Sequence, residues 1–228
     1  IFRWIWIQLF KRSPFNLRDL FLVPKEHNPK GIALFLSGYC NLYKMTTLDS
    51  DLYGTKAEIY NKILKLVNLL DKYKIKTYSG DCWGYNFDWQ ARRLFFFPKN
   101  TPTVVVSSFC AEALFQAYEI TKDKSILKSA LSVGDFIIND LNRTPYNSGF
   151  LFSYSPLDGN NTVFNATMLG AKTLSLCYKF SGNEKYKKIA HQAILTVCES
   201  QSDDGSWVYG LLPIQSWKDS FHTGYNLE

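Results

Sequence analysis

The densest group of chemically capable side chains occupies residues 81–93, which read Asp-Cys-Trp-Gly-Tyr-Asn-Phe-Asp-Trp-Gln-Ala-Arg-Arg. Aromatic faces stack on the apolar faces of sugar rings, whereas carboxylates and guanidinium groups bind hydroxyl or anionic groups. We interpret the segment as a candidate carbohydrate site in which Asp88 or Asp81 acts as the acid or base. The aromatic residues that would stack on sugar and the arginines that would hold a carboxylate are Trp83, Tyr85, Trp89, Arg92 and Arg93.

A second group lies at residues 219–225, which read Asp-Ser-Phe-His-Thr-Gly-Tyr. His222 falls at the start of an expected helix, and with Tyr225 it would supply a second proton-transfer group. The sequence contains no metal-binding spacing, phosphate-binding loop or nucleophile elbow, so we expect no metal and no cofactor.

Both groups also have a structural interpretation, which stays open at this point. Trp83 and Trp89 could be core wedges, and the two aspartates could cap loops or pair with the arginines. His222 could equally well hydrogen-bond a neighbouring loop.

A repeat with a period of 60 residues predicts the elements that must position these side chains. Ala111, Leu114 and Tyr118 recur as Ala171, Leu174 and Tyr178. A fixed period of this kind indicates one supersecondary unit that is repeated and stacked.

Each unit consists of a helix rich in small residues, a polar turn and a second, amphipathic helix. The expected helix pairs are 29–45 with 55–73, 104–120 with 125–141, and 162–180 with 185–200, and a fourth unit begins at Asp219. Ser125 would cap the second helix of the middle unit.

A loop with an aromatic residue, one spacer and a Tyr follows each pair, as Trp83 with Tyr85, Phe152 with Tyr154, and Trp207 with Tyr209. We expect short extended segments there and add Trp207 and Tyr209 to the sugar-stacking residues.

Such hairpins either form an open solenoid or close into a double ring of inner and outer helices. The small residues of the first helices favour the ring, so the predicted fold is all-α, a partial α/α toroid of the (α/α)6-barrel type. Parallel inner helices bring their N-termini to one mouth, where unpaired N–H groups favour anionic ligands. Val105, Asn165 and His222 would take equivalent places at this mouth, and Asn165 is therefore a candidate binding residue.

Composition and charge narrow the class of protein. The net charge of +6 comes from lysines and arginines scattered along the chain, so we expect no nucleic-acid partner. The five cysteines lack C-x-x-C spacing, which predicts reduced core thiols and a cytoplasmic location.

The N-terminal segment, residues 1–27, is expected to be separate from a toroid domain at residues 28–228. Residues 1–12 are apolar but too few to span a bilayer. We expect an amphipathic helix that packs on the body, with a peripheral membrane contact as the alternative. The chain has no initiator Met and stops within an expected helix, which predicts a fragment truncated at its C-terminus.

Four segments together resemble a known family: Cys82–Gln90, Pro98–Thr103, Asp140–Asn142 and Phe221–Tyr225. They are similar to bacterial and archaeal proteins associated with extracellular polysaccharide biosynthesis, which belong with the six-hairpin glycosidase-like α/α toroids. The resemblance extends from about Asn28 over nearly the whole chain. It implies an (α/α)6 barrel with a role in glycan metabolism, of which this chain supplies the first part, and it implies no particular catalytic residues.

Two functions follow. The first is a carbohydrate-active toroid, a hydrolase, lyase or epimerase, acting on an anionic glycan in polysaccharide biosynthesis or modification. The second is a non-catalytic helical-repeat protein that uses the same mouth as a scaffold or to hold a polymer. A terpenoid-cyclase toroid is disfavoured, because the sequence has no Asp-x-Asp-Asp stretch.

Overall fold

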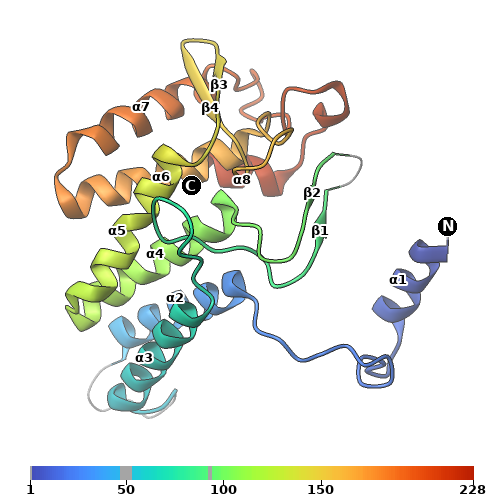
Figure 1. Ribbon diagram of the computed structural model, residues 1–228, viewed down its shortest axis with the longest axis vertical. Coiled ribbons are helices and arrows are strands. Elements are labelled where there is room, and N and C mark those ends of the chain that lie inside the picture. Colours follow the sequence, from blue (N-terminus) through green and yellow to red (C-terminus); the bar gives the residue numbers. More distant parts are fainter. Residues whose placement is uncertain (1, 47–52, 92–93) are drawn as a thin grey trace.

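The computed structural model describes residues 2–46, 53–91 and 94–228. Within them it contains eight α-helices and two small antiparallel sheets (Figure 1). The helices are α1 (Phe2–Arg12), α2 (Pro29–Met45), α3 (Lys56–Lys72), α4 (Val104–Thr121), α5 (Lys124–Asn139), α6 (Phe164–Ser181), α7 (Glu184–Cys198) and α8 (Ser220–Leu227). The strands are β1 (Trp89–Gln90), β2 (Phe96–Phe97), β3 (Arg143–Tyr146) and β4 (Gly149–Phe152).

Local capping explains where the helices begin. Asn28 caps α2, which has a proline in its first turn, and Thr55 forms a capping box with Glu58 at the start of α3. Asp219 caps α8 by accepting the backbone N–H of His222. The predicted helix pairs are confirmed to within a few residues at each end.

The hairpin turns repeat with the same period as the helices. Lys122 and Gly182 both have left-handed backbone conformations, with φ of 57° and 69°. The next residue in each turn, Asp123 or Asn183, caps the second helix. The prediction that Ser125 caps α5 is therefore wrong, because Ser125 donates its backbone N–H to the Asp123 side chain at 2.8 Å.

The helices form two layers. In the inner layer α2 contacts α4, α4 contacts α6, and α6 contacts α8. Each outer helix, α3, α5 or α7, packs against the inner helix of its own hairpin. The inner helices are buried over much of their surface, as in α4, whereas the outer helices bury one face.

Ion pairs join the inner helices at matching depths. Glu112 of α4 lies 3.1 Å from Lys172 of α6, which lies 2.6 Å from Glu228 at the end of α8. Near the C-terminal ends, Glu119 of α4 pairs with Lys44 of α2 at 2.9 Å and Lys179 of α6 at 3.5 Å. These cross-links fit inner helices that run in parallel, with their N-termini at one mouth.

The loops after the outer helices include short extended segments at the rim, as predicted. β3 pairs with β4, and Cys82 forms a bridge with Ile75. Glycine is required in this rim because a Cβ on Gly80 would overlap the backbone carbonyl of Ser132 in α5. Gly149 has the corresponding close contact with the side chain of Thr196 in α7.

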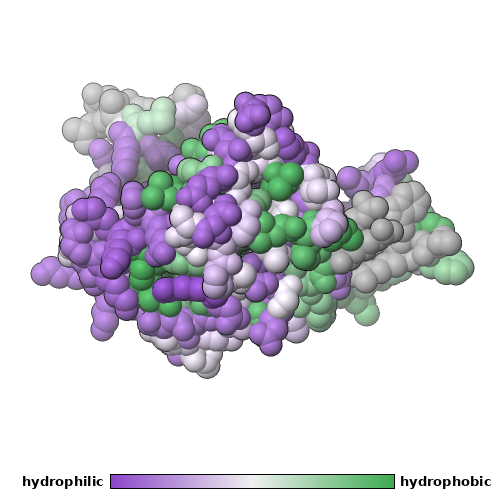
Figure 2. Space-filling model, turned by 90° about the horizontal axis from the view of Figure 1, so that it is seen from above, coloured by the Kyte–Doolittle hydropathy of each residue, from purple (hydrophilic) through white to green (hydrophobic). Residues whose placement is uncertain are grey.

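Helix α1 is set apart from the two layers (Figure 1). Its aromatic contacts are with the segment that follows it, as Trp6 and Phe10 lie 5.7 Å and 5.0 Å from Phe21 between ring centres. Residues 2–12 are thus helical, as predicted, but this helix does not pack on the two layers as expected. Apolar side chains gather on the side of the molecule where α1 lies, and hydrophilic ones cover most of the rest of that face (Figure 2). The division into residues 1–27 and 28–228 stays a prediction.

None of the described helices is both long enough and apolar enough to cross a membrane. All five cysteines have free thiols, and Cys40, Cys82, Cys110 and Cys177 are buried. Cys198 is exposed, so the prediction of a core thiol is wrong for this residue. Burial raises the pKa of the Cys82 and Cys177 thiols to about 12, which agrees with the predicted role of these residues in the core.

Candidate functional site

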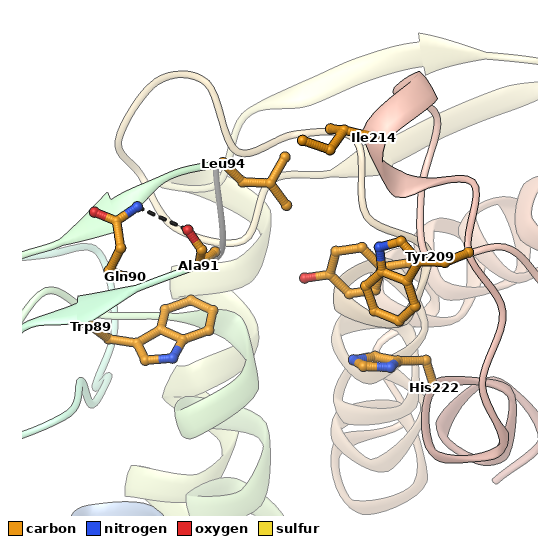
Figure 3. A pocket seen from close by; sticks show the side chains of 8 residues that line it. Trp89, Gln90, Ala91, Leu94, Tyr209, Ile214 and His222 are labelled. Carbon is orange, nitrogen blue, oxygen red and sulfur yellow. Dashed lines mark hydrogen bonds between the residues drawn. The ribbon is translucent and has the colours of Figure 1, made fainter. Parts of the chain in front are cut away.

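A cleft of about 520 Å³ lies at the mouth, between the β1 segment and the segment that leads into α8 (Figure 3). Eight residues line it, four from each segment: Trp89, Gln90, Ala91 and Leu94, and Tyr209, Ile214, Trp217 and His222. Three predicted site residues, Trp89, Tyr209 and His222, thus line the same cleft.

One wall of the cleft is a stack of aromatic rings. Tyr209 and Trp217 lie almost parallel, with ring centres 4.5 Å apart and an angle of 12° between the planes. His222 contacts both rings edge-on, at 4.7 Å and 5.3 Å. Trp217 is 43% exposed, so an indole face remains available to a ligand.

Asp219 orients His222. Its carboxylate oxygens lie 3.0 Å and 2.9 Å from Nδ1 of His222, and Oδ1 accepts the backbone N–H of His222 at 2.7 Å. Partial burial raises the pKa of Asp219, but the hydrogen bonds from His222 outweigh it and lower the pKa overall. A proton on Nδ1 that is donated to Asp219 leaves Nε2 as the acceptor. The distal edge of the ring points into the cleft, toward Trp89 (Figure 3).

The opposite wall is held by aromatic packing on the short sheet. Trp89 stacks on Phe97 of β2 and on Tyr154, with ring centres 5.5 Å away in both cases. Tyr85 lies 6.1 Å from Trp89. This packing fixes the Trp89 ring, which remains partly exposed at the cleft.

The tyrosines of the repeated rim loops converge at the mouth. Burial raises the pKa of Tyr154 well above its usual range, and the nearby Tyr85, Tyr209 and Tyr225 hydroxyls raise it further. Burial likewise raises the pKa of Tyr85 and Tyr209 to about 12. These hydroxyls therefore stay protonated at neutral pH and can donate hydrogen bonds.

Trp83 and Trp207 do not serve as sugar-stacking residues, which corrects the prediction for both. Their side chains are 0% and 3% exposed, and each indole N–H donates to a main-chain carbonyl in the preceding outer helix. The acceptors are Leu70 of α3 at 2.9 Å and Val197 of α7 at 2.8 Å. Each buried indole therefore joins its rim loop to the outer helix of the same hairpin, which is the core role that the sequence had left open for Trp83.

Asp81 is held in an ion pair outside the cleft lining. Its carboxylate lies 3.0 Å from Nζ of Lys74 and accepts the Ser129 hydroxyl at 2.6 Å. The structure therefore gives Asp81 a bridging role between Lys74, just after α3, and the outer helix α5 rather than a place in the lining of the cleft.

Asp88 is exposed and also lies outside the cleft lining. Its Oδ1 accepts the backbone N–H of Lys99 at 2.8 Å, which ties the ends of the β1–β2 excursion together. Asp88 thus takes the loop-capping role that the sequence had left open, whereas Asp81 pairs with Lys74, a partner that was not predicted from the sequence.

Tyr225 and Asn165 are not among the residues that line the cleft. Tyr225 is half-buried, with its ring centre 6.0 Å from that of Phe109 and 4.7 Å from that of Phe221. Asn165 is buried in the first turn of α6, and its Oδ1 has no hydrogen-bond partner in the described part of the chain. Arg92 and Arg93 lie outside the described residues.

Trp217 and Asp219 were missed as site residues in the sequence, and so were the lining residues Gln90, Ala91, Leu94 and Ile214. Trp217 falls outside the repeated rim motif, so the repeat gives no signal for it. Asp219 was identified only as the start of the helix. Its spacing of three residues from His222 could have indicated the pair, because residues at i and i+3 of a helical turn are neighbours.

No family model and no curated protein matches the sequence. The structure is similar to a GH76 α-mannanase from Bacteroides thetaiotaomicron, with a TM-score of 0.57 and 15% identity over 81% of this chain and 49% of the other. It is also similar to a D-mannose isomerase, with a TM-score of 0.56 and 17% identity over 83% of this chain and 48% of the isomerase. For a cellobiose 2-epimerase from Bacillus thermoamylovorans the TM-score is 0.61, at 10% identity over 84% of this chain and 50% of the epimerase.

The fold is a partial α/α toroid. This likeness concerns the fold alone, and this chain spans about half the length of the solved structures that it matches. The predicted fold class is confirmed.

Proposed function

We propose that the cleft binds a carbohydrate and that His222, held by Asp219, transfers a proton on it. The observation that carries the proposal is His222, which lines the cleft together with the Trp89 and Trp217 rings and whose Nδ1 is paired with Asp219. A histidine whose Nδ1 is fixed by a carboxylate presents Nε2 as a general base. The sugar-active names of the structural neighbours support a carbohydrate as the ligand.

The cleft favours one of the candidate reactions. Glycoside hydrolysis generally needs two carboxyl groups on either side of one bond. The described lining of the cleft contains His222, which is paired with Asp219, but no carboxylate, and Asp81 and Asp88 are engaged elsewhere. We therefore favour abstraction of a C–H proton next to a carbonyl or carboxylate group, which is the first step of an epimerase, isomerase or lyase.

The resemblance to polysaccharide-biosynthesis proteins suggests the context, an anionic glycan that is built or modified. The buried free thiols suit a reducing, cytoplasmic compartment. Asn165, with its unpaired Oδ1, would accept a hydrogen bond from a hydroxyl of the ligand.

Deuterium exchange tests the proposal without knowledge of the product. The protein is incubated in D₂O with reducing sugars and with uronic-acid oligosaccharides, and NMR follows loss of the C–H signal beside the carbonyl or carboxylate. We expect exchange by the wild-type protein and none by His222→Gln with the fold intact. Exchange that His222→Gln leaves unchanged would overturn the role of His222.

The second function, a binding scaffold, is favoured by the aromatic walls alone, which need no chemistry to hold a sugar. It predicts NMR shifts of cleft residues on addition of the same oligosaccharides, with no exchange of substrate protons. That outcome would retain the site and remove the reaction.

A further inference from the structure

The lysines of the inner helices differ in whether a carboxylate lies close enough to neutralise their positive charge. Lys44, Lys172 and Lys179 each lie within 3.5 Å of a glutamate on a neighbouring inner helix. Lys30, in the first turn of α2, is the exception: in the described part of the chain no carboxylate lies within 4.0 Å of its Nζ.

Two aromatic rings hold Lys30 in place of an acid. Its Nζ lies 4.3 Å from the centre of the Phe109 ring in α4 and 5.7 Å from that of Tyr225 in α8. An aromatic face attracts and orients an ammonium group but does not cancel its charge. Lys30 is half-buried, and this burial lowers its pKa, so its positive charge lacks both full hydration and a counter-ion.

The position of Lys30 links it to the cleft. Tyr225 is the shared neighbour: its ring packs at 4.7 Å on Phe221, whose ring lies 5.2 Å from His222. Lys30 therefore lies at the same mouth as the His222 cleft, at the end of the inner helices opposite to the Lys44–Glu119–Lys179 ion pairs.

We infer that Lys30, caged by Phe109 and Tyr225, binds the anionic group of the ligand, a carboxylate or phosphate carried by the sugar. This inference rests on the proposed function and deepens it, because it gives the substrate class a recognition residue. An ammonium without a carboxylate partner gains most from an anion that arrives with the ligand, since a charge-assisted hydrogen bond then replaces lost hydration.

Matched ligands and matched lysines test the inference by calorimetry. The ligands are tetragalacturonate, its fully methyl-esterified form, which lacks the charge, and glucose 1-phosphate. The variants are Lys30→Met and the control Lys62→Met, because Lys62 also lies over a tyrosine, Tyr39 at 5.3 Å, but on the outer helix α3.

We expect Lys30→Met to weaken binding of an acidic ligand about ten- to hundredfold and to leave the ester unchanged. Lys62→Met should bind all three as the wild type does. The acidic ligand that binds more weakly to Lys30→Met, tetragalacturonate or glucose 1-phosphate, identifies the anionic group as a carboxylate or a phosphate. Equal affinity of Lys30→Met and wild type for both acidic ligands would overturn the inference, and so would an acid that binds no better than its ester.

Methyl-lysine NMR keeps the inference separable from the proposed function and needs no folded variant. After reductive ¹³C-methylation, the Lys30 signal should shift and saturate with tetragalacturonate or inorganic phosphate. If the ester binds the cleft and the Lys30 signal does not move, the inference fails while the proposed function stands. If no saccharide binds, the proposed function fails. The titration with phosphate still tests the anion site: a shift of the Lys30 signal supports it, and an unchanged signal contradicts it.

Discussion

Asp219 contacts His222 twice, through the ring nitrogen Nδ1 at 2.9 Å and through the backbone N–H at 2.7 Å. One carboxylate thereby both caps α8 and fixes the orientation of the imidazole. Helix capping and orientation of a base are thus combined in a single side chain at the mouth of the toroid.

Substitution of Asp219 separates these two roles. Asp219→Asn retains a good helix cap but removes the negative charge, so we expect stability near that of the wild type and proton exchange slower by about 10²- to 10⁴-fold. Asp219→Ala should in addition lose about 1 kcal/mol of stability. The control is Asp123→Asn, which changes the cap of α5 and should leave exchange unaltered. Undiminished exchange in Asp219→Asn would contradict the account of the pair.

Acid should weaken the fold through carboxylates whose pKa is lowered in the folded state. Hydrogen bonds from His222 lower the pKa of Asp219 despite partial burial, and the hydrogen bond from Lys44 lowers that of Glu119. A lowered folded pKa contributes stability that is present above the unfolded value, about 4, and is lost as the pH falls through the folded value. Urea unfolding should therefore give a constant midpoint from neutral pH to about pH 5 and a falling midpoint below about pH 4. In a Glu119→Gln variant the urea midpoint should fall less steeply with acid than in the wild type. An equally steep fall would show that the Lys44–Glu119 pair does not contribute to the acid sensitivity.

The tryptophans should divide into structural and ligand-contacting residues. Trp83→Phe leaves the Leu70 carbonyl without its indole donor, so we expect a loss of about 1–3 kcal/mol in unfolding free energy. Phe152, at the equivalent place in the middle unit, indicates that a phenyl ring fits there. Trp217→Ala should instead leave stability nearly unchanged and weaken sugar binding by about 0.5–1.5 kcal/mol. The reverse pattern in urea unfolding and calorimetry would show that the two indoles have been assigned wrongly.

Glycines in the rim and in the inner layer should respond in opposite directions. Gly80→Ala places a Cβ against the fixed carbonyl of Ser132, so we expect a loss of about 3 kcal/mol, at the upper end for overpacking. Gly38, in the interior of α2, has open space at its Cβ position, and Gly38→Ala should stabilise the helix by about 0.5–1 kcal/mol. Thermal or urea unfolding measures both, and a tolerated Gly80→Ala would contradict the packing of the rim on α5.

The hairpins were predictable because their signals are local. Apolar spacing, turn residues and caps such as Thr55 are all contained in short stretches of sequence, and the 60-residue period confirms the second hairpin against the third. The exchange of Ser125 for Asp123 as a cap is an error of two residues, within the usual uncertainty of helix ends.

The site was less predictable because it depends on which face of a rim residue meets the body. Trp83 and Tyr85 are two residues apart, and in an extended segment such residues lie on the same face. The structure nevertheless buries Trp83 completely and leaves Tyr85 partly exposed, a difference that alternation does not predict. Asp81 has its partner Lys74 seven residues away, but its bond to Ser129 depends on how α5 packs. Lys30 owes its role to Phe109 and Tyr225 from other hairpins, which no local pattern contains. Trp217 contacts the nearby Tyr209 and His222, but it lies outside the repeated motif.

Indole NMR tests the central claim, that the cleft between Trp89 and Trp217 binds carbohydrate. The chain has six tryptophans, so each ¹⁵N–¹H indole signal can be assigned by single substitution and followed during a titration with methyl-esterified tetragalacturonate. We predict that the Trp89 and Trp217 signals shift and saturate together, while those of Trp83 and Trp207, bonded to main-chain carbonyls in the core, stay in place. Signals of Trp89 and Trp217 that do not move throughout the titration would contradict the account.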